Sequence, residues 1–381
     1  MGIVTKQVEA FDIIVIGAGI AGASVAAELS DGAHILLLEK EDQPGYHTTG
    51  RSAALYTKSY GPPVIRALTR ASWKFFNNPQ SQYIDHPLLQ RRGAMFVARS
   101  DQMKSLKNLQ EKLGDTVQLL NPEEAHKLLP LFRPGYIAGA MIDSEASDID
   151  VAALHQHYLK TFRAAKGELR NQTEVTAMSH DGERWTLQTS KNKVSAPIVV
   201  NASGAWGDSL AEMAGVAPVG LVPKRRTALL ISSPAEMTPD QWPMAIDVDE
   251  QFYLKPDAGK LLISPADETP SPACDAQPDE MDVAVCVDRI ETAFDISVRR
   301  IDHKWAGLRS FVADKCPVCG FDKQVPGFFW LVGQGGYGIQ SAPALARVAS
   351  ALIKGRDIPD DVAAEGVTQA AISPHREKVA A

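Results

Sequence analysis

One segment near the start of the chain constrains its fold more strongly than any other. A short apolar run leads into Gly17, Gly19 and Gly22, which have the spacing GxGxxG. A helix-forming stretch follows, and then a second apolar run that ends in Glu39. Gly17 permits a tight turn after the strand, Gly19 lets backbone approach a pyrophosphate, and Gly22 lets the helix pack closely. The pattern predicts a βαβ unit that binds a dinucleotide.

The chemistry of such a unit is that of an anion site. Phosphates would lie at the N-terminus of the helix, where N–H groups have no intrahelical partner. Glu39, about 20 residues after the glycines, can accept hydrogen bonds from ribose hydroxyls. The motif does not distinguish FAD from NAD(P), and a tight turn without a ligand is the alternative. A simple NAD enzyme is disfavoured, because the chain continues into a long irregular segment, residues 40–63.

Further segments of nucleotide-binding character occur midway and late in the chain. Residues 196–206 form an apolar run that ends in small residues, and residues 327–353 predict a strand, a glycine loop and a helix. Residues 64–77 predict an amphipathic helix, and residues 216–304 are rich in predicted strands. This interleaving also argues against a simple two-domain NAD enzyme.

Composition excludes several classes of protein. The 381 residues include 45% hydrophobic residues, which suffices for a large core, and their net charge is −7. An acidic chain is a poor candidate for binding nucleic acid, which requires clustered Lys and Arg. Four cysteines do not make a disulfide scaffold and favour a reducing compartment. No apolar run reaches the length of a membrane span, about 18 residues or more. We therefore expect a soluble, cytoplasmic protein.

Six stretches, in order, resemble a known family: "VIGAGIAGAS", "QPGYHTTGRSAA", "NASGAWGD", "QFYLKPDAG", "WAGLRSFVAD" and "QGGYGIQ". They are similar to the D-amino-acid oxidase superfamily of FAD-dependent oxidoreductases, and within it to the bacterial D-arginine dehydrogenases. The resemblance implies an α/β, Rossmann-like FAD-binding domain of the glutathione-reductase type, interleaved with a β-rich substrate domain built on an antiparallel sheet. The FAD-binding domain would comprise residues 10–80, 141–215 and 305–365, and the substrate domain residues 81–140 and 216–304.

The resemblance implies FAD as the cofactor, held noncovalently because "WAGLRSF" contains no cysteine. The glycine loop would meet the pyrophosphate, residues 48–54 would line the flavin, and residues 335–340 would meet the isoalloxazine edge. The cofactor-binding residues implied are Gly17, Gly19, Ala21, Gly22, Glu39, Lys40, Thr48, Thr49, Gly50, Arg51, Ser52, Ala53, Ala54, Leu55, Val175, Gly204, Gly335, Gly336, Tyr337, Gly338, Ile339 and Gln340.

The same resemblance implies a clamp for a substrate carboxylate. It would consist of Arg226, Arg309, Tyr60, Tyr253 and the backbone of Gly336. A guanidinium holds a carboxylate in a bidentate manner. The implied reaction is oxidative deamination, in which hydride leaves Cα for flavin N5. The resulting imino acid hydrolyses to a 2-oxo acid and ammonia.

Two positions depart from the D-arginine dehydrogenases. Leu55 stands where those enzymes have a histidine, and Ala94 where they have the glutamate that holds the substrate guanidinium. We therefore expect a pocket for apolar side chains and poor activity on arginine and lysine. Loss of the histidine also removes a candidate acceptor for the amine proton; water or Tyr60 could replace it, or the enzyme could require substrate that is already deprotonated.

Several alternatives stay open. The scaffold could oxidise L-amino acids or secondary amines, or serve as a non-catalytic flavoprotein subunit, and the electron acceptor could be oxygen, a quinone or another carrier. Residues 61–63, "GPP", could be the hinge of a lid that carries Tyr60. "CPVC" at residues 316–319 lacks a second ligand pair for zinc and predicts structural cysteines. No metal site is expected, and His155 and His157, two residues apart on a helix, are interpreted as surface histidines.

Overall fold

The computed structural model describes residues 8–234, 237–377 and 379. Its centre is a six-stranded sheet whose inner strands are apolar and buried. In spatial order these are β10 (Glu168–Arg170), β3 (Ile35–Leu38), β2 (Ile13–Ile16), β14 (Ile198–Asn201), β21 (Phe328–Val332) and β20 (Val318–Phe321). All neighbours are parallel except β20 and β21. Because β2 and β3 are buried on both faces, they read as continuous apolar runs rather than alternating ones.

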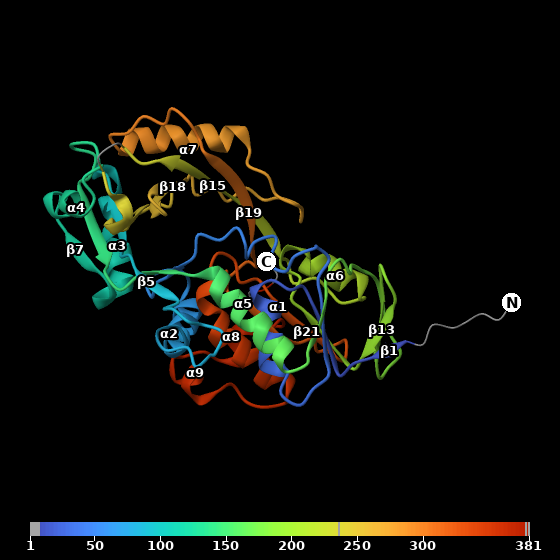
Figure 1. The fold of residues 1–381 in the computed structure, drawn as a ribbon. Coiled ribbons are helices and arrows are strands. Elements are labelled where there is room, and N and C mark those ends of the chain that lie inside the picture. The colour runs from blue at the N-terminus through green and yellow to red at the C-terminus, as the bar shows by residue number, and fades with distance from the viewer. Residues whose placement is uncertain (1–7, 235–236, 378, 380–381) are drawn as a thin grey trace.

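Helices cover one face of this sheet, and a second sheet covers the other. The helices are α1 (Ile20–Leu29), α2 (Pro63–Asn77), α5 (Val151–Ala164) and α8 (Gly338–Ile353), whose labels gather to the left of β21 in the lower part of Figure 1. The opposite face packs on a four-stranded sheet of β1 (Glu9–Ala10), β13 (Lys193–Ala196), β12 (Trp185–Thr189) and β11 (Val175–His180). The predicted βαβ unit, the helix at 64–77 and the late strand–loop–helix are thereby confirmed.

An eight-stranded sheet forms the upper part of the molecule in Figure 1. Its order is β19 (His303–Phe311), β15 (Val222–Ser232), β18 (Lys260–Ser264), β17 (Tyr253–Asp257), β16 (Met244–Asp247), β6 (Ala94–Ala98), β8 (Gly139–Asp143) and β7 (Gln118–Leu120). All neighbouring strands in this sheet are antiparallel except β6 and β16, which are parallel to each other. Residues alternate between its faces, so Leu229 packs toward α7 (Glu280–Ala293) on the outside, whereas Ala228 faces inward.

A small three-stranded sheet joins the two parts. It consists of β4 (Leu55–Tyr56), β9 (Ser147–Ile149) and β5 (Leu89–Arg91). In this sheet Leu55, directly after residues 48–54, pairs with Asp148 of the antiparallel strand β9. This pairing ties the segment after residues 48–54 to β9. The predicted boundaries at 141 and 305 fall inside β8 and β19, both of which belong to the eight-stranded sheet.

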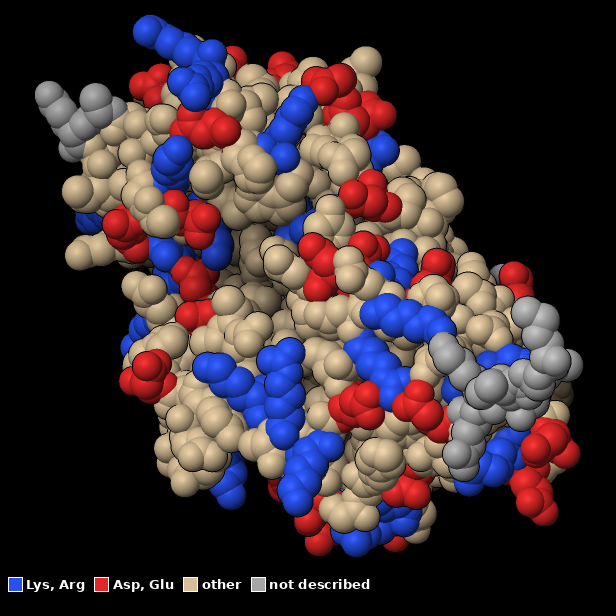
Figure 2. Space-filling view, turned by 45° about the vertical axis from the view of Figure 1, so that its right-hand side comes forward, with Lys and Arg blue, Asp and Glu red and all other residues tan. Residues whose placement is uncertain are grey.

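The remaining helices lie at the periphery. They are α3 (Met103–Leu113), α4 (Pro122–Leu128), α6 (Gly207–Met213), α9 (Asp360–Ala364) and α10 (Gln369–Ile372). Within the described residues, no helix combines the length and the apolar character needed to cross a bilayer. Figure 2 shows basic and acidic side chains interspersed over one face, which is hollowed near its centre.

Candidate active site

The glycine loop after β2 is packed so tightly that side chains would not fit. Gly17 has a φ of +99°, and a Cβ there would lie 2.5 Å from the carbonyl oxygen of Ala202. A Cβ at Gly22 would lie 1.8 Å from the carbonyl oxygen of Gly17, and one at Gly19 would lie 3.2 Å from the Thr49 hydroxyl. The first turn of α1 therefore rests directly on the turn that precedes it, which leaves the helix N-terminus open to a ligand.

Two side chains draw the neighbouring loops over this helix start. The Glu39 carboxylate accepts hydrogen bonds from the backbone N–H groups of Ala18 (2.9 Å) and Glu41 (3.0 Å). The Thr49 hydroxyl accepts one from the N–H of Ile20 at 2.9 Å. The loop after β3 is thereby fixed beside the glycine turn, on the same side as the open end of α1.

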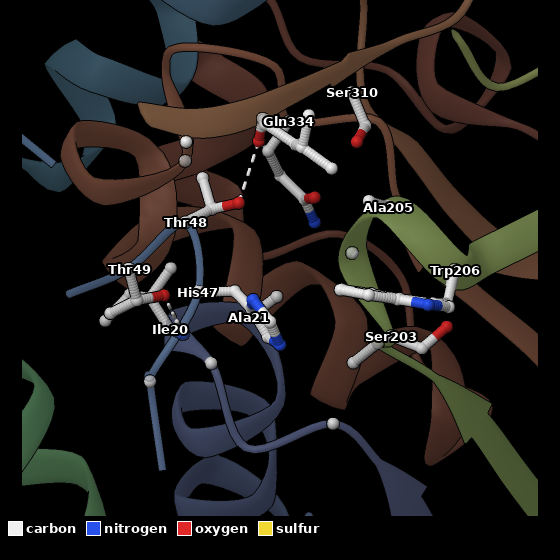
Figure 3. Close-up of a pocket in the computed structure, with 18 of the residues that line it drawn as sticks. Ile20, Ala21, His47, Thr48, Thr49, Ser203, Ala205, Trp206, Ser310 and Gln334 are labelled. Atoms are coloured by element: carbon white, nitrogen blue, oxygen red, sulfur yellow. Dashed lines mark hydrogen bonds between the residues drawn. The ribbon is translucent and has the colours of Figure 1, made fainter. Parts of the chain in front are cut away.

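The next residues of that loop attach it to β19 of the eight-stranded sheet. The Thr48 hydroxyl donates a hydrogen bond to the carbonyl oxygen of Leu308 at 2.7 Å (Figure 3). The Arg51 guanidinium donates to the carbonyl oxygens of Ala276 and Ala306, each at 3.0 Å. Residues 48–51 therefore bridge the two parts of the molecule.

A long cavity runs between these elements, with about 1770 Å³ of space that atoms do not fill, part of it open to solvent. Figure 3 shows the start of α1 below it, Thr48 and Thr49 on one side, Ser203 and Trp206 on the other, and Gln334 and Ser310 above. We call it the larger cavity. Sixteen of the residues predicted to bind the cofactor line it: Gly17, Gly19, Ala21, Glu39, Lys40, Thr48, Thr49, Arg51, Ser52, Ala53, Val175, Gly204, Gly335, Gly336, Gly338 and Ile339.

A second, smaller cavity adjoins the first. The two share lining residues, among them Ala53, Arg226, Tyr253, Arg309 and Gly336. Every residue predicted for the carboxylate clamp or the side-chain pocket lines the smaller cavity: Tyr60, Tyr253, Arg226, Arg309, Gly336, Leu55 and Ala94. These residues come from six regions of the sequence, so the fold brings together a set that was proposed from resemblance alone.

The two arginines carry positive charge that the surrounding protein compensates incompletely. They stand on neighbouring strands β15 and β19. Arg226 is buried, its terminal nitrogen lies 3.4 Å from a Glu268 carboxylate oxygen, and its Nε has no hydrogen-bond partner among the described residues. Burial and the neighbouring charge of Arg309 lower the pKa of Arg226. Within the same described residues, the Arg309 guanidinium forms neither a hydrogen bond nor an ion pair. Such a site favours an anion.

The backbone of the loop after β21 lies against the Arg309 guanidinium. A Cβ at Gly336 would lie 3.0–3.1 Å from Nη1, Cζ and Nε of Arg309. Since these three atoms are nearly equidistant, Gly336 faces the flat side of the guanidinium. Gly335 has a φ of +55°, and a Cβ there would lie 2.1 Å from the ring of Phe311. Glycine at both positions therefore sets the position of Arg309 and its strand.

Tyr60 and Gln340 complete the polar part of the smaller cavity. Burial raises the pKa of Tyr60 above its usual range, so the phenol stays a neutral hydrogen-bond donor. Its ring meets the ring of Tyr337 edge-on with centroids 4.9 Å apart. The side-chain oxygen of Gln340 accepts from the N–H of Thr57 at 3.2 Å. Its amide nitrogen is buried without a partner among the described residues, and the residue lines the cavity.

The segment that carries Tyr60 is anchored by hydrogen bonds of the two hydroxyls that precede it. The buried Asp143 carboxylate accepts hydrogen bonds from the hydroxyls of Thr57 (2.8 Å) and Ser59 (3.0 Å). Pro62 and Pro63 are the cap and the first residue of α2, where proline is well tolerated. Two of the three residues of the predicted hinge at residues 61–63 therefore belong to a helix start, Gly61 before them has a φ of +91°, and the hinge itself stays a prediction.

The far wall of the smaller cavity is apolar. Ala94 and Phe96 on β6 pair with Met244 and Ile246 on the parallel strand β16, and all four line the cavity with Leu55. Ala94 is fully buried and lines the smaller cavity, so its side chain borders the space where a substrate side chain would lie. The two departures from the D-arginine dehydrogenases thus fall on one continuous apolar surface.

One acidic residue at the cavity was not anticipated. Glu250 lines the smaller cavity from the turn between β16 and β17, has a φ of +55° and is exposed. No motif in the sequence points to it. Its exposure places it at the rim, so the interior of the cavity still presents guanidinium, phenol and amide groups.

Some predicted cofactor residues lie elsewhere. Leu55, Ala54 and Gln340 line the smaller cavity only. Gly22, Gly50 and Tyr337 line neither: Gly22 and Gly50 serve close backbone packing, and the Tyr337 ring is buried between Tyr60 and Phe311. Residues of the larger cavity that sequence reasoning missed include His47, Trp206, Ser310 and Gln334.

The interpretation of His155 and His157 as surface residues is wrong. Both are buried, because α5 is covered on more than one side. The Nε2 of His155 donates to the carbonyl oxygen of Ala18 in the glycine loop at 2.9 Å, and burial lowers the pKa of His155. His157 lies 2.7 Å from the Ser81 hydroxyl. His155 therefore supports the dinucleotide loop from behind.

The cysteines of the remaining sequence motif, residues 316–319, lie just before β20 and within it. Cys319 is buried in β20 and Cys316 is partly buried, and neither belongs to a group of three or more potential metal ligands among the residues that the structure describes.

Comparison with known proteins decides the family. A profile of the family described as "FAD dependent oxidoreductase" matches residues 12–352. The chain is a member of this family. This FAD-dependent oxidoreductase is 23% identical over 376 residues to the glycine oxidase of Geobacillus kaustophilus, covering 94% of this chain and 97% of that protein. It is 25% identical over 275 residues to 4-methylaminobutanoate oxidase (formaldehyde-forming) of Paenarthrobacter nicotinovorans, covering 68% of this chain and only 33% of that protein.

Solved structures show the same fold for this oxidoreductase. The crystal structure of glycine oxidase from Geobacillus kaustophilus superposes with a TM-score of 0.82 at 21% identity and covers 97% of this chain and 99% of that one. L-α-glycerophosphate oxidase from Mycoplasma pneumoniae, with FAD bound, also gives a TM-score of 0.82, at 18% identity, with coverage of 91% and 95%. The FAD-binding fold with a β-rich second part is thereby confirmed, whereas the finer resemblance to D-arginine dehydrogenases stays a prediction.

The larger cavity fits FAD. The turn at Gly17 and the first turn of α1 leave backbone N–H groups open for a diphosphate, and the Glu39 carboxylate closes the end of β3 nearby. The loop at Gly335–Gly336 borders both cavities, so a dinucleotide lying along the larger one would present one end to Arg309. FAD is therefore the cofactor of this oxidoreductase, and the smaller cavity is its candidate substrate site.

Proposed function

We propose that this protein oxidises free α-amino acids, with D-amino acids of apolar side chain as its substrate class. The observation that supports this most strongly is the pair of guanidinium groups at the junction of the two cavities. Arg309 has no counter-ion among the described residues, and Arg226 has one long contact. A substrate carboxylate would complete both, with Tyr60 and Tyr253 as further donors.

The chain's own residues position the substrate. The clamp fixes the carboxylate, and hence Cα, at the side of the smaller cavity where Gly336 and Ala53 border the larger one. FAD, when bound, supplies the two-electron acceptor for the hydride that leaves Cα. The amine loses a proton in the same conversion, and water then hydrolyses the imino acid to a 2-oxo acid and ammonia.

The apolar wall supports the class of side chain. Leu55, Ala94 and Met244 offer neither charge nor hydrogen bonds to a cationic side chain. A charged hydrogen-bonded pair contributes roughly 1.5–3 kcal/mol, which corresponds to about 10- to 150-fold in binding. We therefore expect D-arginine and D-lysine to be poorer substrates than D-leucine, D-methionine or D-phenylalanine.

The residues that line the smaller cavity also limit which group could remove the proton from the substrate's ammonium. Among the described lining residues of the smaller cavity, none is a histidine, Tyr60 is held neutral, and Glu250 stands at the exposed rim. We propose that the enzyme selects substrate that is already deprotonated at nitrogen. Oxidation would then accelerate as the pH approaches the value at which each substrate's ammonium dissociates.

The decisive experiment is anaerobic mixing of the holoenzyme with a panel of D- and L-amino acids, glycine, N-methylglycine and 2-hydroxy acids, followed by the loss of flavin absorbance. Rapid bleaching by apolar D-amino acids supports the proposal. Bleaching only by L-amino acids or N-methylglycine would move the function to the alternative substrates of the same clamp. No bleaching by any carboxylate-bearing compound would contradict an amino-acid oxidising function altogether.

A further inference from the structure

Four side chains at the edge of the larger cavity form a closed ring of contacts. The Lys40 ammonium lies 3.4 Å from the centroid of the Trp206 ring and 3.5 Å from the Glu41 carboxylate. Glu41 lies 2.7 Å from Nε2 of His47, and the His47 and Trp206 rings have centroids 4.7 Å apart. We call these four residues the clasp. It joins the loop after β3 to η3 (Gly204–Trp206), which follows β14.

The clasp spans the cavity from one wall to the other. Lys40, His47 and Trp206 all line it. In Figure 3 the His47 and Trp206 side chains extend toward each other from opposite sides, above the loop that leads into α1 at Ile20 and Ala21. Since that helix start is where the cofactor's diphosphate fits, the clasp lies beside the middle of the dinucleotide rather than at either end.

His47 has one ring nitrogen left for a ligand. A carboxylate can only accept, so the Nε2–H group of His47 donates to Glu41. Its Nδ1 is buried and has no partner among the described residues. A buried polar atom without a partner, at the wall of a cavity, calls for a polar group of the bound molecule. With the proton on Nε2, Nδ1 is an acceptor, and the ribose and ribityl hydroxyls of FAD along this part of its length can donate to it.

We propose that the clasp closes over the central, diphosphate-bearing part of FAD and sets how slowly the noncovalent cofactor leaves, with His47 Nδ1 hydrogen-bonded to it. The Trp206 ring, held in place by the Lys40 ammonium, forms the wall that a departing cofactor must displace. This proposal requires only that the chain binds FAD and is independent of the substrate class proposed above.

The test is the rate at which FAD leaves the purified holoenzyme on dilution, followed by the rise in FAD fluorescence. Trp206→Ala opens one wall, Trp206→Phe keeps an aromatic wall, His47→Ala removes the buried nitrogen, and Lys40→Met removes the charge over the indole. Trp73→Ala is the matched control: the Lys58 ammonium lies 5.3 Å from the Trp73 ring centroid, and Trp73 lines neither cavity. Thermal unfolding of each holoenzyme shows whether its fold is retained.

The expected result is a dissociation rate constant raised about 10-fold or more in Trp206→Ala and His47→Ala, less in Trp206→Phe, and unchanged in Trp73→Ala. Folded Trp206→Ala and His47→Ala variants that release FAD at the wild-type rate would overturn the proposal, as would equal acceleration by Trp73→Ala. If Trp206→Ala does not fold, the His47→Ala and Lys40→Met rates decide in the same way. Because no amino acid is present, failure here leaves the substrate proposal unaffected, and the converse holds too.

Discussion

Replacing Gly336 by alanine should weaken the carboxylate clamp without disturbing the fold. The added Cβ would lie 3.0–3.1 Å from three atoms of the Arg309 guanidinium, inside ordinary van der Waals contact. Gly336 is not among the glycines of positive φ, so the backbone tolerates the substitution. The guanidinium must therefore move by a few tenths of an ångström along the normal to its plane, away from the loop.

The expected loss follows from what a displaced guanidinium forfeits. A hydrogen bond to a charged group contributes about 1.5–3 kcal/mol when well aligned. Partial misalignment that loses roughly 1–2 kcal/mol corresponds to a fall in affinity of about 5- to 30-fold. We expect this loss in the binding of a carboxylate that cannot be oxidised, and in kcat/KM for the amino-acid substrate.

The assay is titration of the holoenzyme with such a carboxylate, followed by the change in the flavin spectrum, with FAD content and melting temperature measured on the same sample. The uncharged amide of the same acid serves as the ligand control, since it does not engage the guanidinium as an anion. Carboxylate affinity within twofold of the wild type, at full FAD content, would refute the role given to Gly336 and Arg309.

Four other outcomes test the site. Ala94→Val fills the fully buried position on the apolar wall, so it should lower kcat/KM for D-phenylalanine more than for D-alanine; equal effects would place the substrate side chain elsewhere. Because burial raises the pKa of Tyr60, the phenol stays protonated up to a higher pH than an ordinary tyrosine and cannot act as the base that accepts the amine proton. The value of kcat/KM should therefore rise with pH, with a midpoint that follows the ammonium pKa of each substrate. A midpoint common to all substrates would indicate a base on the enzyme. Asp143→Ala removes the acceptor shared by two buried hydroxyls and should destabilise the protein by about 1–3 kcal/mol in urea unfolding, with a raised KM; an unchanged KM would show that Tyr60 is positioned without this anchor. Burial lowers the pKa of His155 below its unfolded value, so its contribution to stability is present above the unfolded pKa and is lost as the pH falls below it; His155→Gln should reduce the acid sensitivity of the urea midpoint, and an unchanged sensitivity would assign it to other groups.

The parts of this site that the sequence predicted well are those with local causes. Gly17 and Glu39 belong to one βαβ unit, in which strand, turn and helix are contiguous. Glycine is required there because a Cβ at Gly17 or Gly22 would lie only 1.8–2.5 Å from a backbone carbonyl oxygen. The cofactor class followed from that unit together with its resemblance to a known family. Tyr253 and Arg226, far apart from the glycine loop in sequence, could be placed only through that resemblance.

The parts that were missed depend on long-range packing. His155 was assigned to the surface because its spacing from His157 puts the two on different sides of α5, yet both sides are covered by other elements. Glu250 reaches the cavity from a tight turn with positive φ that no motif marks. Trp206 meets Lys40 across the cavity, a pairing that depends on how the second half of the sheet closes on the first.

The two arginines give a physical reason why, in the proposed function, the substrate would bind at the junction of the two cavities. Placing Arg226 and Arg309 on neighbouring strands, one buried and the other partly so, opposes folding through desolvation and mutual repulsion, and burial followed by the Arg309 charge lowers the pKa of Arg226 accordingly. Glu268 compensates only from 3.4 Å and also pairs with Lys224. A second carboxylate, placed between the guanidinium groups, would relieve this imbalance. No described carboxylate forms an ion pair with Arg309. In the function proposed above this carboxylate belongs to the substrate, so the clamp would favour carboxylate-bearing substrates whatever their side chain or handedness.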